Sequence, residues 1–310
     1  MGETKKTVGI EVTKASLGCL GTVLAAIIGG IFLLISAERT AKNPTPSSDA
    51  TSSLVVSTAG LSASTTVLPN GTISPPATQA SFCNGEQTWI KRTYLPEEEI
   101  RECWDKENYL TGLAYADDEW FAILTNQVGF TNQAYFTDAA LPKDKIRKYW
   151  DEDFDITHIY YGDGQWVVVM SKGTGFINQT YFTNADFPES DIQEKWDQGY
   201  FINAVAYGDD TWVIVMSQGT NLSQQVYLMD TVLPEDKIKE YWERGSDITG
   251  IAYGASKWVV IMSEGMNYAN QSYLKQSDYP EEDIKSYWDK DFNITSIAYG
   301  NNSWVVAMSK

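Results

Sequence analysis

Histidine is almost absent from this sequence, since His158 is the only one among 310 residues. General acid–base catalysis and most zinc sites depend on histidine or cysteine. The three cysteines, Cys19, Cys83 and Cys103, form no cluster with the spacing of metal ligands. We therefore expect no enzyme activity, no cofactor and no metal site, and we interpret His158 as a solvent-facing residue of a strand.

Basic residues are scarce relative to acidic ones, with 23 Lys and Arg against 41 Asp and Glu. Residues 1–81 hold five of the basic and four of the acidic residues, which leaves 18 against 37, a net charge of −19, in residues 82–310. An acidic surface repels the phosphate backbone of nucleic acids. The sequence thus disfavours nucleic acid as a partner and leaves a protein, a peptide or a glycan open.

Charge is missing altogether from residues 15–36, ASLGCLGTVLAAIIGGIFLLIS. As a helix rising about 1.5 Å per residue, this stretch would span roughly 30 Å of hydrocarbon. We interpret it as a transmembrane helix. The alternative is a cleaved signal peptide, because Ser36 and Ala37 resemble a cleavage site, although the apolar cores of signals usually run about 7 to 15 residues. The lysines before the span favour a cytoplasmic tail at residues 1–14 and an extracytoplasmic main domain.

Residues 37–81 are rich in Ser, Thr, Pro and Ala and lack helix or strand periodicity, which predicts a flexible linker to a domain at residues 82–310. If that domain lies in an oxidising compartment, Cys83 and Cys103 can form a disulfide that ties the start of the domain to its first helix. Two reduced thiols are an equally open interpretation, because the compartment is itself inferred.

Ten of the eleven tryptophans recur every 46 residues, in two series without a single insertion. Five copies at a fixed period indicate a repeat architecture. The first series is Trp104, Trp150, Trp196, Trp242 and Trp288, and the second is Trp120, Trp166, Trp212, Trp258 and Trp304. We expect both series to be structural, with the first holding a short helix of each unit against its sheet.

The sequence of each 46-residue unit predicts three strands and one helix. Residues 156–162 (ITHIYYG) and 166–171 (WVVVMS) read as a hairpin whose second strand is buried on both faces, and residues 178–183 (NQTYFT) read as a third strand. Residues 188–196 (PESDIQEKW) predict a helix that begins at a proline. Because this helix has only two to three turns, it must pack against a sheet to be stable.

The two ends of the repeat region complement each other. The last copy stops after its second strand, near Met308, whereas residues 87–92 before the first hairpin supply a third strand. An open stack would leave unpaired strand edges at both ends. We therefore predict that the N-terminal strand completes the final sheet, which gives a closed five-bladed α/β propeller with three strands and one helix in each 46-residue unit.

Residues 82–310 resemble a tryptophan-rich repeat region of unknown function that follows the kinase domain in some cyanobacterial Ser/Thr kinases and in plant casein-kinase-one-like kinases. The resemblance rests on W-V-V-x-M-S-x-G, Q-x-Y and P-x-x-x-I-x-x-x-W, as in residues 166–173, 179–181 and 188–196. It implies an accessory or recognition module linked to kinase signalling. Kinase activity is not implied, because the chain has no Gly-rich loop, catalytic Asp loop or magnesium-binding motif.

A glutamine also recurs in every unit, and hydrophobic packing does not explain it. Each amide either satisfies buried backbone groups between neighbouring blades or contacts a ligand at the mouth of the ring. These candidates are Gln87, Gln133, Gln179, Gln225 and Gln271.

The sequence as a whole indicates a membrane-anchored recognition or sensing module without catalysis, whose ligand it does not identify. Two alternatives are an attachment protein that binds cell-wall or other carbohydrate and an enzyme with its site at the mouth of the ring.

Overall fold

The computed structural model describes residues 37–39, 83, 85–126 and 128–310. The predicted tail, the predicted transmembrane helix and most of the predicted linker lie outside these residues. Among the described helices, none is long and apolar enough to cross a membrane. One short strand, β1 (Ala37–Arg39), lies within the predicted linker, where the sequence pattern predicts no strand.

The described chain repeats one order of elements, strand, helix, strand, strand, five times. The first unit is β2 (Gln87–Arg92), α1 (Glu97–Trp104), β3 (Asn108–Ala116) and β4 (Glu119–Asn126). The second is β5 (Asn132–Asp138), α2 (Lys143–Asp151), β6 (Asp155–Gly162) and β7 (Gln165–Lys172). The third is β8 (Gln179–Asn184), α3 (Glu189–Asp197), β9 (Phe201–Gly208) and β10 (Thr211–Ser217). The fourth is β11 (Ser223–Asp230), α4 (Glu235–Glu243), β12 (Asp247–Gly254) and β13 (Lys257–Glu264). The fifth is β14 (Gln271–Gln276), α5 (Glu281–Trp288), β15 (Asn293–Gly300) and β16 (Ser303–Ser309).

Each unit forms one three-stranded sheet whose middle strand is the last in chain order. In the first unit, β4 lies between β2 and β3 and runs antiparallel to both. The predicted hairpin, the central buried strand, the third strand and the proline-initiated helix are therefore confirmed. Among the residues that the structure describes, the third sheet alone has a fourth strand, because β1 pairs with β8.

The prediction that the N-terminal strand completes the final sheet is wrong. Strand β2 pairs with β4 of its own unit, and the final sheet is completed by β14, which pairs with β16. The repeating unit begins at the outer strand and crosses through its helix to the inner hairpin, so all five copies are whole. Every sheet is thus built from one contiguous stretch of chain, apart from the addition of β1.

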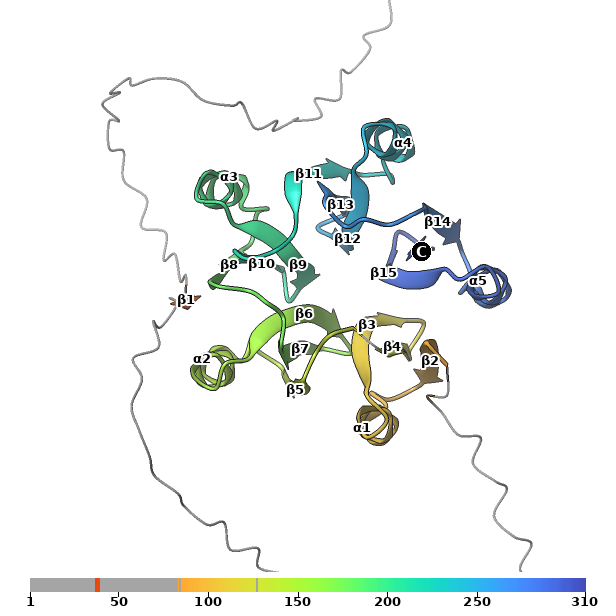
Figure 1. Cartoon of the computed structure of the whole chain (residues 1–310), viewed down its shortest axis with the longest axis horizontal. Coiled ribbons are helices and arrows are strands. Elements are labelled where there is room, and N and C mark those ends of the chain that lie inside the picture. Colours follow the sequence, from red (N-terminus) through yellow and green to blue (C-terminus); the bar gives the residue numbers. More distant parts are fainter. Residues whose placement is uncertain (1–36, 40–82, 84, 127) are drawn as a thin grey trace, which may run out of the picture.

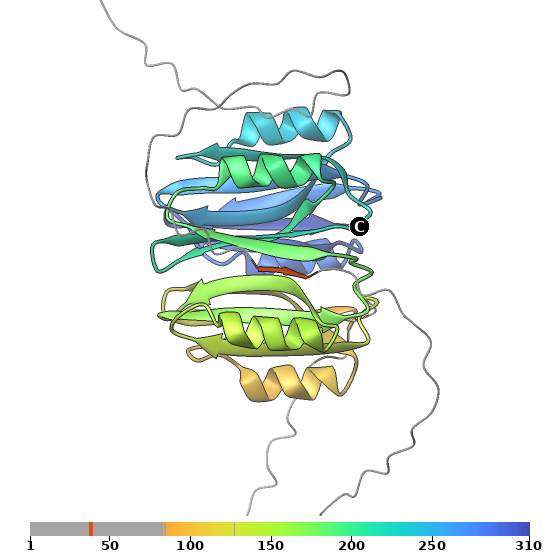
Figure 2. The same ribbon diagram turned by 90° about the vertical axis from the view of Figure 1, so that its left-hand side faces the viewer.

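The five sheets surround a common centre, with the helices outermost (Figure 1). The inner strands are β3, β6, β9, β12 and β15. Each contacts the inner strand of the next unit, and β15 contacts β3. Figure 2, the view from the side, shows the helices lying alongside the sheets in the direction of the strands. The first and last units are therefore neighbours.

The core lies in and between the sheets. In β7, Val168 and Met170 pack in the cluster that includes Trp166, whereas Val167 and Val169 pack against residues of the first unit, including Leu113. Both faces of the central strand are thus buried, as predicted. The second tryptophan series is the best-buried set of large side chains, at 0 to 2% exposure, so these rings belong to the core.

Neighbouring units approach each other closely at the turn end of the inner strands. A Cβ atom at Gly208 would collide with the ring of Tyr161 in the preceding unit, and Gly300 has the same relation to Tyr253. Glycine is required there because the tyrosine ring rests on its backbone. At the interface between the fifth and first units the position is Ala116, which lies in one cluster with Tyr299.

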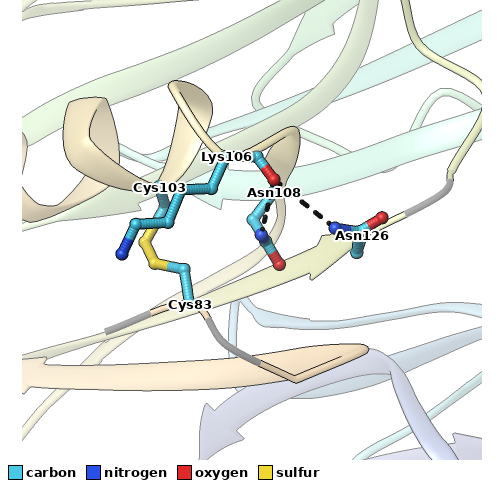
Figure 3. The surroundings of a disulfide bond; sticks show 5 residues. All are labelled: Cys83, Cys103, Lys106, Asn108 and Asn126. Atoms are coloured by element: carbon cyan, nitrogen blue, oxygen red, sulfur yellow. Dashed lines mark hydrogen bonds between the residues drawn. A yellow bond between two sulfur atoms is a disulfide. The ribbon is translucent and has the colours of Figure 1, made fainter. Parts of the chain in front are cut away.

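A disulfide joins Cys83 to Cys103 near the C-terminal end of α1 (Figure 3). Cys103 is fully buried, and the two Cα atoms lie 5.5 Å apart. The chain beside it is fixed by the side chains of Asn108 and Asn126, which both donate to the carbonyl oxygen of Lys106. The bond therefore holds the residue that precedes β2 against the helix of the same unit.

Candidate functional site

The five glutamines each join two neighbouring units, as Gln133 shows. Its Oε1 accepts hydrogen bonds from Nε1 of Trp104 at 2.8 Å and from the backbone N–H of Leu110 at 2.7 Å. Its Nε2 donates to the carbonyl oxygen of Leu110 and to Oγ of Ser171, both at 3.1 Å. Trp104 and Leu110 belong to the first unit, whereas Gln133 and Ser171 belong to the second. The amide therefore uses both lone pairs and both N–H groups inside the protein.

The same arrangement recurs at every interface between units. The partners are Trp150, Ile156 and Ser217 for Gln179; Trp196, Ile202 and Ser263 for Gln225; Trp242, Ile248 and Ser309 for Gln271; and Trp288, Ile294 and Thr125 for Gln87. The set around Gln87 joins the fifth unit to the first.

This geometry favours the structural interpretation of the glutamines. A side chain whose four bonding positions are filled inside the protein has none left for a ligand. It also explains the first tryptophan series, whose indole N–H groups donate to the glutamines in addition to packing against the sheet. The sequence carried a signal for four of these pairs, because Trp104, Trp150, Trp196 and Trp242 each precede their glutamine by 29 residues. The fifth pair joins Trp288 to Gln87, 201 residues earlier in the chain.

A small cavity of about 80 Å³ lies among the inner strands. All five inner strands contribute to it at equivalent repeat positions, and its polar side chains include Thr111, Asn203, Thr249 and Thr295. A volume of this size holds a few water molecules, whereas ligand sites commonly measure about 300 to 1,000 Å³. This cavity is therefore too small for a sugar or a peptide.

His158 lines this cavity, so the prediction that it faces solvent is wrong. Its Nδ1 is buried and has no hydrogen-bond partner. Burial lowers the pKa of His158 to about 4, because the charged imidazolium loses its hydration there. The ring is therefore neutral at neutral pH. Nothing in this environment supplies the acidic partner that would poise a histidine for proton transfer.

Two rings of the second unit occupy positions that hold small residues in the other units. The imidazole of His158 stacks on Tyr160, with ring centroids 6.0 Å apart and planes 7° from parallel. The side chains at the His158 position elsewhere are Gly112, Ala204, Gly250 and Ser296, and those at the Tyr160 position are Ala114, Ala206, Ala252 and Ala298. His158 and Tyr160 lie opposite Val169 and Val167, the residues that face the first unit. Their bulk lies toward the first unit, and β3 and β6 are less closely packed than the other pairs of neighbouring inner strands.

A larger groove, of about 390 Å³, lies on the outer side between the first and second units. Residues Gln133 to Thr137 of β5 form its floor, and residues of α1 and α2 form its walls. Figure 1 shows β5 between these two helices. Aromatic rings line it in two pairs: Trp104 packs against Tyr135 with centroids 5.6 Å apart, and Phe136 packs against Tyr149 at 5.2 Å.

The walls of this groove carry charges of both signs. On α1, Arg101 donates to Glu97 at 3.0 Å, and on α2, Nζ of Lys145 donates to the carbonyl oxygen of Thr137 at 3.3 Å. The hydroxyl of Tyr135 is buried without a hydrogen-bond partner. Burial, reinforced by the negative charge of Glu97, raises the pKa of Tyr135 well above its usual range. Sequence reasoning missed this groove, because it combines residues that recur in every unit, such as Trp104 and Gln133, with residues that vary, such as Thr137 and Lys145.

The acidic turns of the first three units have a conformational role. Asp117, Asp118, Asp163, Asp209 and Asp210 all have positive φ, a conformation that Asp tolerates better than most residues. The hydroxyls of Tyr115 and Tyr207 donate to Asp118 and Asp210 at 3.3 Å. Among the residues that the structure describes, no group of three or more His, Cys, Asp and Glu side chains is placed to hold a metal ion.

Comparison with known proteins finds one family model, a domain of unknown function (DUF7477), which matches residues 78–211 and 199–310. The two matches together cover all five units. No curated protein matches the chain. The family match carries no link to kinases, so the resemblance to kinase-associated repeats stays an expectation from the sequence.

Proposed function

The chain belongs to the DUF7477 family, whose function is unknown, and from its own geometry we propose that it is a membrane-anchored, non-catalytic recognition module. Its described domain supplies a rigid support, and its ligand binds in the outer groove between α1 and α2. The membrane anchor in this proposal rests on the apolar sequence of residues 15–36.

The support is a closed five-bladed α/β propeller. Two observations favour closure: the contact between β15 and β3, and the hydrogen bonds of Gln87 with Trp288 and Ile294. A ring held by the same amide arrangement at every interface keeps its surface loops and helices in fixed relative positions. Rigid supports of this kind suit recognition, because little conformational entropy is lost when a ligand binds.

The groove between α1 and α2 is the observation that carries the proposal. Its volume of about 390 Å³ lies within the usual range of ligand sites, whereas the central cavity of about 80 Å³ does not. Aromatic side chains with an apolar body and polar groups at the rim are typical of recognition surfaces. The narrow centre also argues against an enzyme site at the mouth of the ring.

Attachment to carbohydrate is the second candidate, and the aromatic lining of the same groove favours it. Sugars stack on exposed aromatic faces, and Tyr149 presents a partly exposed ring there. The two candidates share one location and differ in the chemistry of the ligand.

The test is a binding screen with matched variants. The full chain in lipid nanodiscs is presented to arrays of immobilised peptides and glycans, and Arg101→Ala is compared with Lys285→Ala. Both residues form an ion pair with a glutamate four residues earlier, at 3.0 and 2.6 Å, but only Arg101 lines the groove. We expect Arg101→Ala to weaken binding at least fivefold and Lys285→Ala to leave it unchanged. Equal effects of the two variants, or no bound probe, would refute the groove as the site.

A further inference from the structure

The outer edge of a sheet in this fold holds an additional strand in one unit. In the third unit, β1 pairs antiparallel with the outer strand β8, with Ala37 opposite Tyr181 and Arg39 opposite Gln179. Figure 1 shows β1 at the periphery beside β8, between α2 and α3. An edge strand presents a row of backbone N–H and C=O groups, and addition of a strand to such an edge is a common way of binding extended peptides.

The outer groove lies along the corresponding edge of the second unit. Gln133 and Tyr135 occupy the repeat positions of Gln179 and Tyr181. Strand β5 is the edge strand of its sheet and pairs with β7. The groove follows β5 from Gln133 to Thr137, a distance of roughly 13 Å at the rise of a strand. This length matches a segment of four or five extended residues.

The backbone of β5 is oriented for such pairing. The carbonyl oxygen of Thr137 accepts from Lys145 of the neighbouring helix, so it points away from β7 and toward the groove. In an antiparallel strand the N–H and C=O of one residue point to the same side, and every second residue shares that side. The N–H and C=O of Tyr135 therefore face the groove as well. Lys145 thus occupies the carbonyl oxygen of Thr137 at one end of β5, and the backbone groups of Tyr135 stay accessible for pairing.

The fifth unit shows how the same edge can be closed. There Glu235 of α4 accepts from the hydroxyl of Tyr273 at 2.9 Å and from Nζ of Lys275 at 2.7 Å, which ties the helix to β14. The equivalent residues in the groove are Glu97, Tyr135 and Thr137. Threonine cannot replace the lysine of this bridge, and Glu97 pairs with Arg101 of its own helix instead.

We propose that this groove binds an extended peptide of a partner protein, which adds to β5 as an antiparallel strand. Its main chain hydrogen-bonds to the N–H and C=O of Tyr135, and its side chains lie against Trp104 and Tyr149. The inference rests on the proposed function, because it specifies the ligand and the binding mode of the same site.

The first experiment alters the backbone of a probe peptide and leaves the protein intact. The probe is a fluorescein-labelled heptapeptide, ISAERTA, the sequence of residues 35–41, because its central residues are the ones seated on the equivalent edge. Its binding to the full chain in nanodiscs is measured by fluorescence anisotropy. N-methylation at Ala and Arg, the residues opposite Tyr181 and Gln179, removes edge-facing N–H groups, whereas N-methylation at the intervening Glu does not. We expect the first change to weaken binding at least tenfold and the second less than threefold.

The second experiment alters the edge of the protein. Tyr135→Pro and Tyr135→Ala both remove the phenol ring, but only proline also removes the backbone N–H. We expect Tyr135→Pro to weaken the binding of the heptapeptide at least fivefold more than Tyr135→Ala, with equal melting temperatures for the two variants. If the proline variant does not fold, the methylated peptides still decide the question.

The outcomes separate this inference from the proposed function. Binding that is insensitive to N-methylation, or no binding of the heptapeptide, overturns strand addition. If a glycan in the array then binds and Arg101→Ala abolishes its binding, the recognition function stands and the peptide inference falls. A dimer of the full chain that Ala37→Pro dissociates would identify the occupant as β1 of a second copy, and it would overturn a partner protein as the ligand.

Discussion

Gln87 accepts a hydrogen bond at 2.6 Å from the backbone N–H of Ile294, 207 residues further along the chain. The same side chain donates to the carbonyl oxygen of Ile294 at 2.9 Å. One amide of β2 thus satisfies both backbone groups of Ile294 in β15, the last inner strand. The first and fifth units are held together by side chains and not by a shared sheet.

Replacing Gln87 tests this link. Gln87→Ala leaves the buried N–H and C=O of Ile294 without partners, so we expect a loss of about 2 to 4 kcal/mol in the free energy of unfolding. Gln133→Ala should cost a similar amount, because its contacts are equivalent. The exposed Gln276 is the control, and Gln276→Ala should change stability by less than about 0.5 kcal/mol. Urea denaturation measures all three, and a neutral Gln87→Ala would contradict closure.

His158 predicts a specific dependence of stability on pH. Its pKa is lowered to about 4 in the folded protein, whereas that of an unfolded histidine is about 6.5. Between these values the unfolded chain binds more protons than the folded one, so stability falls as the pH drops from about 6.5 to about 4. The loss attributable to this residue is about 3 kcal/mol.

The measurement compares the chain with His158→Gln by urea denaturation at several pH values. Carboxylates that titrate in the same range act on both proteins, so the difference between the two curves isolates the histidine. We expect the wild type to lose more stability than the variant between pH 7 and pH 4. Parallel curves would show that His158 is hydrated in the folded state.

Because of the disulfide between Cys83 and Cys103, we expect the protein to be less stable under reducing conditions than under oxidising ones. A bond between residues 20 positions apart restricts the unfolded chain, and its removal should cost about 3 kcal/mol. The variant with Cys83→Ser and Cys103→Ser is compared with the oxidised protein by thermal denaturation. The intact mass of the unreduced protein should be lower than that of the reduced one by the mass of two hydrogen atoms. An unchanged mass would show that the two thiols stay reduced.

The contact between the ring of Tyr161 and the backbone of Gly208 means that a larger residue at position 208 should destabilise the protein. Gly208→Ala places a methyl group in the ring of Tyr161, and overpacking of this kind costs about 1 to 3 kcal/mol. Ala116→Gly is the matched change at the interface between the fifth and first units, where a methyl group is already present. We expect it to cost no more than about 1 kcal/mol, the backbone effect of glycine. Thermal denaturation of both variants distinguishes the two interfaces.

The elements of each unit could be predicted from the sequence, but the grouping of strands into sheets could not. The spacing of Trp166, Pro188 and Trp196 indicates a hairpin, a third strand and a helix, and the structure has all of them. A periodic sequence does not show, however, at which residue each unit begins. The strand at residues 87–92 therefore fits the first sheet as well as the last. The crossover through α1 decides between them, because it returns the chain to the sheet that it left.

The candidate site was harder to predict, for a related reason. Repeated positions in the sequence show what the units share. The shared glutamines, however, use all their hydrogen-bonding positions within the protein, as Gln133 does. The groove combines these shared residues with residues that vary between units, such as Thr137 where the fifth unit has Lys275. The environment of His158 could not be predicted in this way, because a residue that varies between units more often lies at the surface. Its small counterparts Gly112, Ala204 and Gly250 instead mark a crowded centre, where bulk in one unit needs the others to be small.

Because each sheet is finished before the next one begins, the chain can fold in the order of its synthesis. The first unit has its hairpin, helix and outer strand once Asn126 has left the ribosome. Among the described strands, only β1 waits for a partner in a later unit, because it pairs with β8. Contacts within a unit are short in sequence, which favours rapid formation. Only the final docking of β15 against β3 depends on both ends of the domain.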